Sequence, residues 1–451
     1  MMKLTFHGAA REVTGVNYLL EDSTTKLLID CGLFQGAKTA EEKNRDPFPY
    51  NPLEIDVLFV THAHLDHIGR IPKLVRAGFK GRIISTLPTR DLAELSLTDS
   101  LGILTKEAER DGEKPIYEEK DVQRAMSLWE TVEYDSEITV NDLKVTFKEA
   151  GHILGSAMVE IKRGDKRVVF TGDLGNPPTP LLKDPHKLEN ANYLIMESTY
   201  GDKEHEGRDE RKTKVERIIE DTIKNKGVLM IPAFSIERTQ ELLFELNDLA
   251  ENGRIPRVPI FLDSPLAIKA TAIYKKHEDY YNKEAKYIIE SGDDVFKFPG
   301  LEFSLTTEES KKINNVPPPK IIIAGSGMST GGRIIHHEKR YLPDSNSALL
   351  LVGFQSAGSL GRRIQEGAKW VKILGEDIPV KAGVIRIKGY SAHPDTNWLL
   401  DFVKGSSERL EKVFVAQGEM KAASFIAQRI RDYLGVKAVV PKQGDSFELD
   451  M

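Results

Sequence analysis

The chain has 451 residues, of which 40% are hydrophobic and 29% charged, and its formal net charge is −6 at pH 7. This composition is typical of a globular protein of two or three domains, and the acidic balance excludes a global attraction to nucleic acid. A local excess of positive charge exists at 361–390, which contains seven Lys or Arg and three acidic residues. Cys31 is the only cysteine, which excludes a disulfide within the chain and a thiolate zinc site. With no apolar run long enough for a membrane span and a polar start, we expect a cytoplasmic protein without a membrane partner.

The residue pattern in the first half of the chain predicts several strands and two helices. Apolar and β-branched runs bounded by Gly, Asp and Ser predict short strands over the first 90 residues. Helices are predicted near 88–110 and 118–130, and strands resume after them. The stretch AMVEIKRGDKRVVF (157–170) predicts a hairpin about Gly164–Asp165.

After about residue 200 the pattern changes to alternating helices and strands. A helix ending at Gly227 is followed by the strand VLMIPAF, and the alternation continues to ALLLVGF, which predicts a parallel sheet. From about 380 strands return, followed by two closing helices. We therefore expect one domain, made of 1–200 and 381–451, to be interrupted by an inserted domain, 201–380. The proline cluster NNVPPPK at 314–320 is expected to form a loop within the insert.

The stretch FVTHAHLDHIGR (59–70) concentrates metal-ligating side chains, in a chain with only 11 histidines. His62 and His64 follow a buried strand, and in extended backbone the i, i+2 spacing directs both imidazoles to one side. Asp66 and His67 stand at the turn into a helix and can face a second point about 3.5–4 Å from the first. A zinc ion usually takes four ligands. The motif can therefore begin two metal sites but complete neither.

Later strand ends offer the missing ligands. His152 follows the strand VTFKEA, and Asp173 follows VVFTG, where glycines permit close approach and two carboxylate oxygens can bridge two cations. Asp30 ends a strand in LLIDCG, either as a turn cap or as a support for a ligand or the attacking water. Alone, each residue is ordinary, because a loop His is usually structural and Asp often forms turns. Together they predict a site on loops at one edge of a sheet.

In this order the motifs resemble the metallo-β-lactamase superfamily. MESTYGD with Glu197, GYSAHPD with His393 and the glycine-rich AGSGMSTGGR resemble its β-CASP branch of nucleic-acid-processing nucleases. HGAAREVTG and VPIFLDSPLA resemble bacterial and archaeal ribonucleases related to the endonuclease subunit of the eukaryotic mRNA cleavage factor. The resemblance covers essentially the whole chain. It implies an α/β fold, an αββα metallo-β-lactamase sandwich with an inserted parallel-sheet α/β β-CASP domain, and a cleft between the two.

The resemblance also implies two Zn²⁺ ions and their ligands. The first ion would be held by His62, His64, His152 and Asp173. The second would be held by Asp66, His67 and the bridging Asp173. In the family a histidine in a V-H-G-E motif completes the second site. This chain reads VFVAQGEM, with Gln417 at that position, as a second-metal ligand or as a partner of metal-bound water.

The implied reaction is hydrolysis of an RNA phosphodiester, endonucleolytic or 5′-to-3′ exonucleolytic, that leaves a 5′-phosphate and a 3′-hydroxyl. Two zinc ions would share a water and lower its pKa towards neutrality. The leaving ribose oxygen needs a proton, and His393, kept protonated by Glu197, is the expected general acid. The catalytic residues expected are His393, Glu197, Asp30 and Asp66.

Substrate contacts are expected in the insert. Backbone amides of GSGMSTGG (325–332) can nest a phosphate oxygen, and Ser326, Gly327 and Arg333 are expected contacts. Arg238 and Arg362 are further candidates, although a lone Arg usually lies on a solvated face. The expected partner is RNA in single-stranded form, and a homodimer is one expected assembly.

Three other hypotheses stand beside the ribonuclease. A small-molecule hydrolase of the same superfamily is opposed by the large insert and the GYSAHPD motif. A DNA nuclease of the β-CASP branch usually carries valine in the last motif, so Gln417 matches neither class. A partner subunit with a decayed site is opposed by the six of seven expected ligands that are present.

Overall fold

The computed structural model describes residues 1–36, 38–205, 208–353, 355–356 and 358–451. The chain divides into two compact units. The first unit comprises Met1–Thr179, Lys183–Glu204 and His393–Met451, and the second comprises Pro180–Leu182 and His205–Ala392. One α/β unit is thus inserted into another, which confirms the predicted fold class.

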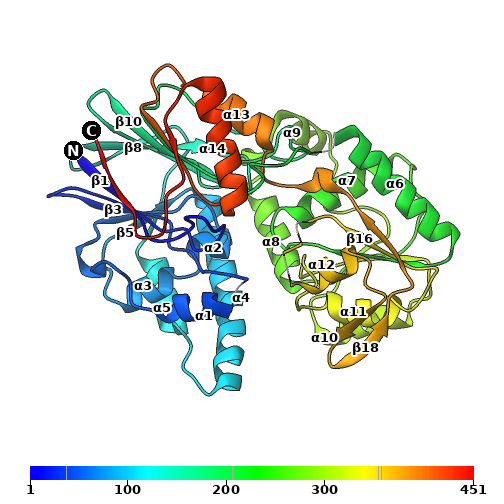
Figure 1. The fold of residues 1–451 in the computed structure, drawn as a ribbon. Helices are drawn as coiled ribbons and strands as arrows, with labels where there is room; N and C mark the ends of the chain where they lie inside the picture. The colour runs from blue at the N-terminus through cyan, green and yellow to red at the C-terminus, as the bar shows by residue number, and fades with distance from the viewer. Residues whose placement is uncertain (37, 206–207, 354, 357) are drawn as a thin grey trace. The chain divides into compact units, whose positions relative to one another are not determined.

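Two sheets form the centre of the first unit (Figure 1). The first sheet has the order β22 (Ser446–Leu449), β1 (Met2–Phe6), β2 (Tyr18–Glu21), β3 (Lys26–Ile29), β4 (Val57–Phe59), β5 (Arg82–Ser85) and β6 (Trp129–Thr131). The second has the order β21 (Ala438–Val439), β20 (Lys412–Val415), β11 (Tyr193–Met196), β10 (Lys166–Phe170), β9 (Ala157–Arg163), β8 (Leu143–Glu149) and β7 (Glu137–Val140). Their inner faces share one apolar core, in which Phe59 and Phe147 meet with ring centroids 6.0 Å apart.

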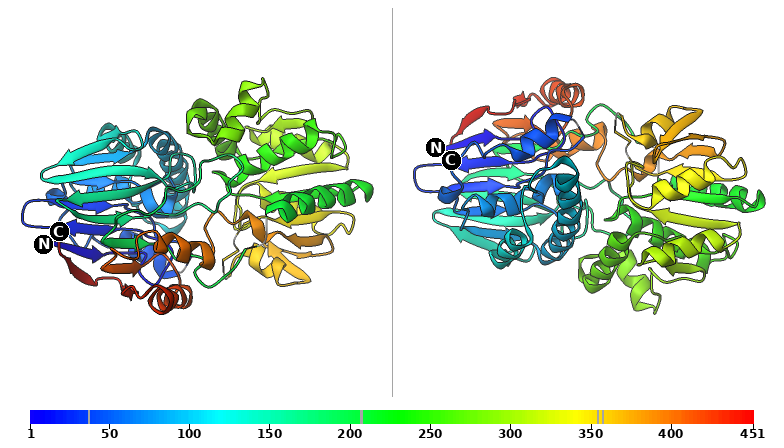
Figure 2. Two further views of the ribbon diagram at one scale, coloured as in Figure 1. Left: turned by 90° about the horizontal axis from the view of Figure 1, so that it is seen from above. Right: turned by 90° about the horizontal axis from the view of Figure 1, so that it is seen from below.

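Helices cover the outer faces of both sheets. Figure 1 shows α13 (Thr396–Lys404) and α14 (Met420–Leu434) over the second sheet, and their buried Leu399 and Ile426 pack against Leu194 of β11. The other outer layer contains α1 (Lys38–Arg45), η1 (Pro52–Glu54), α2 (Leu65–Ile68), α3 (Ile71–Arg76), α4 (Leu87–Asp111) and α5 (Glu119–Ser127). The first unit is therefore the predicted αββα sandwich. Both views in Figure 2 show the two termini side by side, where β1 pairs with β22.

Local chemistry explains why the predicted elements form where they do. The helix α4 begins at Thr86, whose hydroxyl caps the N–H of Thr89, and it ends at Gly112 with a φ of +70°. It confirms the helix predicted near 88–110. The helix predicted near 118–130 is shorter, because residues beyond Ser127 enter β6. The hairpin about Gly164–Asp165 is confirmed by the pairing of β9 with β10.

The second unit contains a six-stranded sheet in which every described pair is parallel, as predicted. Its order is β14 (Leu301–Phe303), β13 (Ile260–Leu262), β15 (Lys320–Ala324), β12 (Val228–Pro232), β16 (Ala348–Leu351) and β19 (Gly383–Arg386). A small antiparallel pair follows, β17 (Trp370–Ile373) with β18 (Glu376–Pro379). The helices are α6 (Arg208–Lys224), α7 (Arg238–Glu251), α8 (Pro265–Lys276), η2 (Glu278–Tyr280), α9 (Lys283–Glu290), α10 (Thr307–Lys312), η3 (Ile313–Asn315), α11 (Ile334–Tyr341), α12 (Leu360–Gln365) and η4 (Lys388–Tyr390).

The end of the insert differs from the sequence-based boundary at residue 380. The strand pattern after 380 suggests a return to the first domain, but β19 pairs in parallel with β16 of the inserted sheet. The second unit consequently extends to Ala392. Strand pairing of this kind depends on which edge is open, and composition does not reveal it. Within the described ranges, no helix is both long and apolar enough to cross a membrane.

Candidate active site

Polar side chains gather where strands of the first unit end. Asp30 directly follows β3, and His62 and His64 follow β4. In the second sheet, His152 lies beyond β8 and Asp173 beyond β10. Because β3 and β4 are parallel, and β10, β11 and β20 are also parallel, the carboxyl ends of these strands share an edge of their sheet. Segments distant in sequence are therefore brought to one end of the sandwich.

Four of these side chains converge on one point. Nε2 of His62 lies 3.1 Å from Nδ1 of His64, and Nε2 of His152 lies 3.3 Å from the same nitrogen. Oδ2 of Asp173 lies 3.5 Å from Nε2 of His62 and 3.5 Å from Nε2 of His152. One donor atom from each residue lies within 4.8 Å of the others. These are the four residues that the resemblance assigns to the first metal.

Burial keeps three of these imidazoles in the form that binds metal. It lowers the pKa of His62 and of His152 well below the usual value for histidine, and it lowers the pKa of His64 to about 4. A neutral imidazole presents a nitrogen lone pair, whereas an imidazolium presents none. Three lone pairs and one carboxylate that face each other form a donor set for a divalent metal ion.

Asp30 holds His67 in place. Oδ2 of Asp30 accepts hydrogen bonds from Nδ1 of His67 and from Oγ1 of Thr61, both at 2.7 Å, and Oδ1 accepts the N–H of Thr61 at 2.8 Å. His67 then presents Nε2 to Oδ1 of Asp173, 3.2 Å away. Although burial opposes a charge on His67, Asp173 and Asp30 raise the pKa of His67 well above its usual value. In the absence of a cation His67 is therefore held as an imidazolium, and a metal ion that binds here would have to displace its Nε2 proton.

Asp66 lies next to His67 in the single-turn helix α2. Burial raises the pKa of the Asp66 carboxyl to about 6, and a cation beside it would reverse that effect. Gly32 permits this turn to pack closely, because a Cβ at Gly32 would lie 1.5 Å from the carbonyl oxygen of Asp66. A second close approach occurs at Gly172, whose Cβ would lie 2.7 Å from Cβ of Thr61. The two glycines let the loops that carry Asp30 and Asp173 approach the histidine motif.

Gln417 occupies the position where the resemblance places a histidine. It follows β20, is 2% exposed and has a φ of +46°. Its side-chain nitrogen donates a hydrogen bond to Oδ1 of Asp173 at 2.6 Å and lies 3.3 Å from Nε2 of His67. Gln417 therefore contacts two of the three residues assigned to the second metal. Its amide presents a hydrogen atom where a metal ligand would present a lone pair.

Glu197 and His393 form a pair beside the metal-ligand cluster. Nδ1 of His393 lies 2.9 Å from Oε2 of Glu197, which is fully buried, and 4.0 Å from Oδ2 of Asp173. The N–H of Leu174 donates to Oε1 of Glu197 at 2.7 Å and fixes the carboxylate. Burial alone would lower the pKa of His393, but the neighbouring Glu197 raises that pKa to about 9. The imidazole of His393 is therefore protonated at neutral pH, and its ring stacks on Tyr200 with centroids 6.2 Å apart.

Comparison with known proteins identifies the family. The model of the metallo-beta-lactamase superfamily matches residues 10–207, and the Beta-Casp domain model matches residues 239–364. The model of the Zn-dependent metallo-hydrolase RNA specificity domain matches residues 377–441. Ribonuclease TTHA0252 of Thermus thermophilus is 38% identical over 418 residues, which cover 93% of each chain. The chain belongs to the β-CASP branch of the metallo-β-lactamase superfamily. The resemblance predicted from the sequence motifs is thus confirmed.

Other members of this branch are similar over most of the chain. An RNase J-like protein of Methanocaldococcus jannaschii is 34% identical over 450 residues, which cover 98% of this chain and 99% of that protein. The transcription termination factor FttA of Methanosarcina mazei is 33% identical over 455 residues, which cover 97% of this chain and 70% of that protein. A crystal structure of an Enterococcus faecalis protein of unknown function covers 99% of this chain with a TM-score of 0.60 at 12% identity, which supports the fold alone.

Three of the predicted RNA contacts lie around the loop after β15 of the β-CASP unit. Oγ of Ser326 lies 3.1 Å from Oγ1 of Thr330, and a Cβ at Gly327 would lie 2.8 Å from the ring of Phe234. Nη1 of Arg333 donates to Oδ1 of Asp263 at 2.7 Å. The structure thus brings these residues together on one loop, but Arg333 is already bound to a carboxylate.

The two remaining arginine candidates have different environments in the β-CASP unit. Arg238 is 5% exposed and pairs with Glu241 within α7. Arg362 lies at the surface, where Nε donates to Oε1 of Glu366 at 2.6 Å. Arg362 is therefore accessible from solvent, whereas Arg238 forms an internal ion pair.

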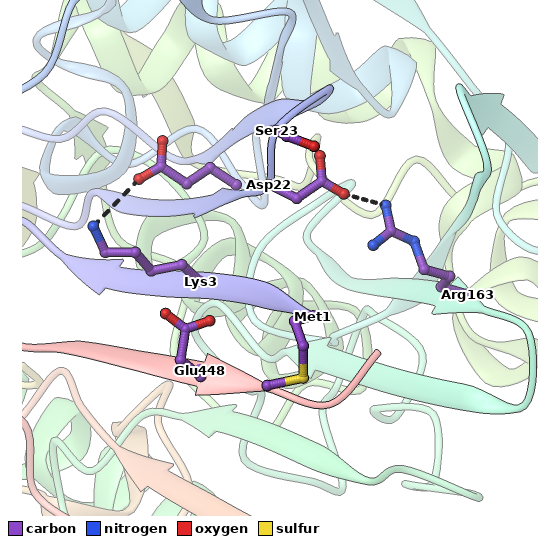
Figure 3. A pocket seen from close by; sticks show the side chains of 7 residues that line it. Met1, Lys3, Asp22, Ser23, Arg163 and Glu448 are labelled. Atoms are coloured by element: carbon purple, nitrogen blue, oxygen red, sulfur yellow. Dashed lines mark hydrogen bonds and ion pairs between the residues drawn. The ribbon is translucent and has the colours of Figure 1, made fainter.

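The first unit also has a hollow of about 570 Å³ that is unrelated to the metal-ligand cluster (Figure 3). It lies at the β2–β3 and β9–β10 turns, which are at the opposite end of these strands from Asp30 and Asp173. Four of its charged side chains form two pairs, Arg163 with Asp22 at 2.6 Å and Lys3 with Glu21 at 3.6 Å. The hollow offers no group that the chemistry of this family needs.

Sequence reasoning missed residues that hold the predicted ones. Thr61 stands one position before the histidine motif and links Asp30 to the metal-ligand turn. Tyr200 lies within MESTYGD and stacks on His393. Because Tyr200 lies within the motif that contains Glu197, the sequence did give a reason to consider it. For Thr61 it gave none, because a threonine at a strand end is common.

Proposed function

We propose that this chain is a zinc-dependent ribonuclease that hydrolyses RNA phosphodiester bonds and leaves a 5′-phosphate and a 3′-hydroxyl. One observation carries the proposal. The four-residue metal-ligand cluster shares Asp173 with the pair formed by His393 and Glu197. The candidate proton donor thus lies next to the candidate metal site, with Nδ1 of His393 4.0 Å from Oδ2 of Asp173. The names of the relatives, ribonuclease and RNase J-like protein, support RNA as the substrate class.

The donor geometry of the first site favours zinc. Zinc binds imidazole nitrogen and carboxylate oxygen at about 2.0–2.2 Å, so ligand atoms around a tetrahedral ion stand about 3.3–3.6 Å apart. Four of the six separations within the cluster run from 3.1 to 3.5 Å, and all six lie within 4.8 Å. Calcium and magnesium prefer all-oxygen ligands. His62, His64, His152 and Asp173 would thus hold the first zinc ion, because three imidazole nitrogens and one carboxylate are donors that zinc accepts.

The second site is expected to bind zinc less tightly than the first. Asp66, His67 and the bridging Asp173 supply three donors, and Gln417 supplies an amide where the family has an imidazole. We therefore infer one tightly bound zinc and a second that binds less tightly. When bound, zinc lowers the pKa of water towards neutrality and offsets charge on phosphoryl oxygens.

The residues of the chain supply the proton and its position. His393 donates a proton from Nε2 to the leaving ribose oxygen, because Nδ1 is engaged by Glu197. Glu197 keeps the imidazole charged and oriented. Asp30 holds His67 and does not face the substrate, since it is fully buried behind that imidazole. Single-stranded RNA, a cytoplasmic location and a homodimer remain parts of the same proposal.

A side-by-side assay tests this function. The chain is stripped of metal by a chelator, reconstituted with zinc, and given single-stranded RNA, single-stranded DNA of the same sequence and a thioester. We expect cleavage of RNA that depends on zinc and far slower turnover of the other two substrates. Preferred cleavage of DNA would instead favour a DNA nuclease, and thioester turnover without RNA cleavage would favour a small-molecule hydrolase. Zinc binding without turnover of any substrate would indicate a non-enzymatic subunit.

A further inference from the structure

A buried network of charged side chains holds the segment just before His393. Within the β-CASP unit, Glu245 of α7 accepts hydrogen bonds from the hydroxyl of Tyr390 and from the guanidinium of Arg211 on α6. Arg211 also donates to the carbonyl oxygen of Gly389 at 2.9 Å, and its guanidinium carbon lies 4.2 Å from the ring centroid of Tyr390. Tyr390 is therefore held through its hydroxyl, its ring face and its neighbouring backbone.

The groups of this network are removed from water. Tyr390 is fully buried, and Arg211 and Glu245 are 4% and 6% exposed. Burial, together with Glu245, raises the pKa of Tyr390 well above its usual value, so the hydroxyl stays protonated and donates. A buried ion pair is weak evidence for stability, and its best-attested use is to select one arrangement among several. We interpret the network as a device that fixes the position of Tyr390.

Tyr390 lies close in sequence to the candidate proton donor. The β-CASP unit ends at Ala392, and the first unit resumes at His393. The three peptide units between Tyr390 and His393 span at most about 10–11 Å when extended. The chain itself therefore keeps His393 within about 10–11 Å of Tyr390. At the other end of this link, Glu197 holds the imidazole.

We propose that Tyr390 is a positioning residue for His393, and that Arg211 and Glu245 fix it for this purpose. The proposal rests on the proposed role of His393 as general acid. Tyr390 acts through His393 and not on the phosphodiester. Misplacement of a reacting group by about 1 Å can cost about 100-fold in rate. Loss of the Tyr390 anchor should therefore slow the step in which the leaving oxygen is protonated and leave metal binding unchanged.

The test compares two leaving groups. Tyr390→Phe keeps the ring over Arg211 and removes only the hydroxyl that binds Glu245. One substrate is an ordinary RNA, and the other is the same RNA with sulfur in place of the scissile 3′ oxygen. A thiol has a pKa of about 8.5, so the sulfur leaves without a proton. The 3′ oxygen requires one. Single-turnover rates on both substrates separate a defect in proton donation from a general defect.

We expect Tyr390→Phe to cleave ordinary RNA about 10-fold more slowly, less than the loss of about 10²–10⁴-fold expected for removal of a general acid. The sulfur-substituted RNA should be cleaved within about twofold of the wild-type rate, because its leaving group does not need the general acid. Equal slowing of both substrates, or no slowing of either, would overturn the positioning role. His393→Ala, measured in parallel, checks the premise. If that variant slows both substrates equally, His393 is not the general acid, and the premise of this inference fails independently of the role of Tyr390.

Two controls accompany the test. Tyr287→Phe removes a hydroxyl from a tyrosine of the same unit that is 74% exposed, and it should change neither rate. Glu245→Gln keeps the size of the side chain but removes the charge that pairs with Arg211, and it should give the same selective slowing as Tyr390→Phe. Zinc content and thermal unfolding are measured for each variant. If either network variant fails to fold, the other decides the question.

Discussion

Replacement of Gln417 by histidine should strengthen the second metal site. In the structure the Gln417 amide donates to Oδ1 of Asp173, the oxygen that faces His67. A histidine there would present a nitrogen lone pair in place of that hydrogen atom. The backbone suits the change, because Gln417 has a φ of +46° and histidine is among the non-glycine residues enriched at positive φ.

The magnitude follows from the hydrogen bond that a second zinc ion must displace. A hydrogen bond to a charged group contributes about 1.5–3 kcal/mol. At about 1.4 kcal/mol per tenfold change in affinity, its loss corresponds to about 10- to 150-fold. Changes to the residues that support or complete a metal site act on the same scale, about 10- to 100-fold. We therefore expect Gln417→His to raise the affinity for the second zinc, and the rate of RNA cleavage at limiting zinc, by about 10- to 100-fold.

The assay is a zinc titration against a competing chelator, with single-turnover RNA cleavage measured at each zinc concentration. Gln428→His provides a matched control, because Gln428 lies exposed on α14 of the same unit. It adds the same imidazole away from the site and should leave the second affinity unchanged. Two tightly bound zinc ions in the unaltered chain, with no gain in Gln417→His, would refute this reasoning. The second site would then be completed by another group.

Three further predictions concern the residues around the first metal. His64→Ala removes one of four donors, so we expect loss of the tight zinc, measured by mass spectrometry of metal content, and loss of nearly all hydrolysis. His393→Ala should keep that zinc but cleave RNA about 10²–10⁴-fold more slowly, and an unchanged rate would make His393 structural. Because Glu197 raises the pKa of His393 to about 9, the proton donor is present below that pH and is lost as the pH rises through it. Glu197→Gln should shift this descending limb of the pH–rate profile towards about 6.5, and an unmoved limb would contradict the pairing.

Much of the site follows from residue type and spacing. The H-x-H-x-D-H stretch limits its side chains to a strand end and one helical turn, so convergence of His62 and His64 could be predicted locally. His152 and Asp173 are ordinary alone and indicate a site only when they are taken together, and the resemblance was needed to assign each of them to a particular metal. Their meeting depends on parallel strands ending at one edge. That depends on strand order, which local sequence does not specify.

The parts that could not be predicted depend on pairing between distant segments. The position of β19 in the inserted sheet depends on the open edge of β16, and no motif marks it. Glu245, Arg211 and Tyr390 are separated by up to 179 positions, and each has an ordinary sequence context. Only the folded chain shows that they form one buried network. Contacts to RNA are the least determined, because an arginine at the surface and one in an internal ion pair have the same sequence signature.

The most direct measurement of the central claim is the chemistry of the cleaved RNA ends in ¹⁸O-labelled water. Zinc-reconstituted chain is given single-stranded RNA, and the products are analysed by mass spectrometry. Hydrolysis by a water activated at the site predicts one ¹⁸O atom in each new 5′-phosphate and an unlabelled 3′-hydroxyl, with both products absent after chelation and in His64→Ala. A 2′,3′-cyclic phosphate or a 3′-phosphate at the cut, or cleavage that persists without metal, would contradict the account.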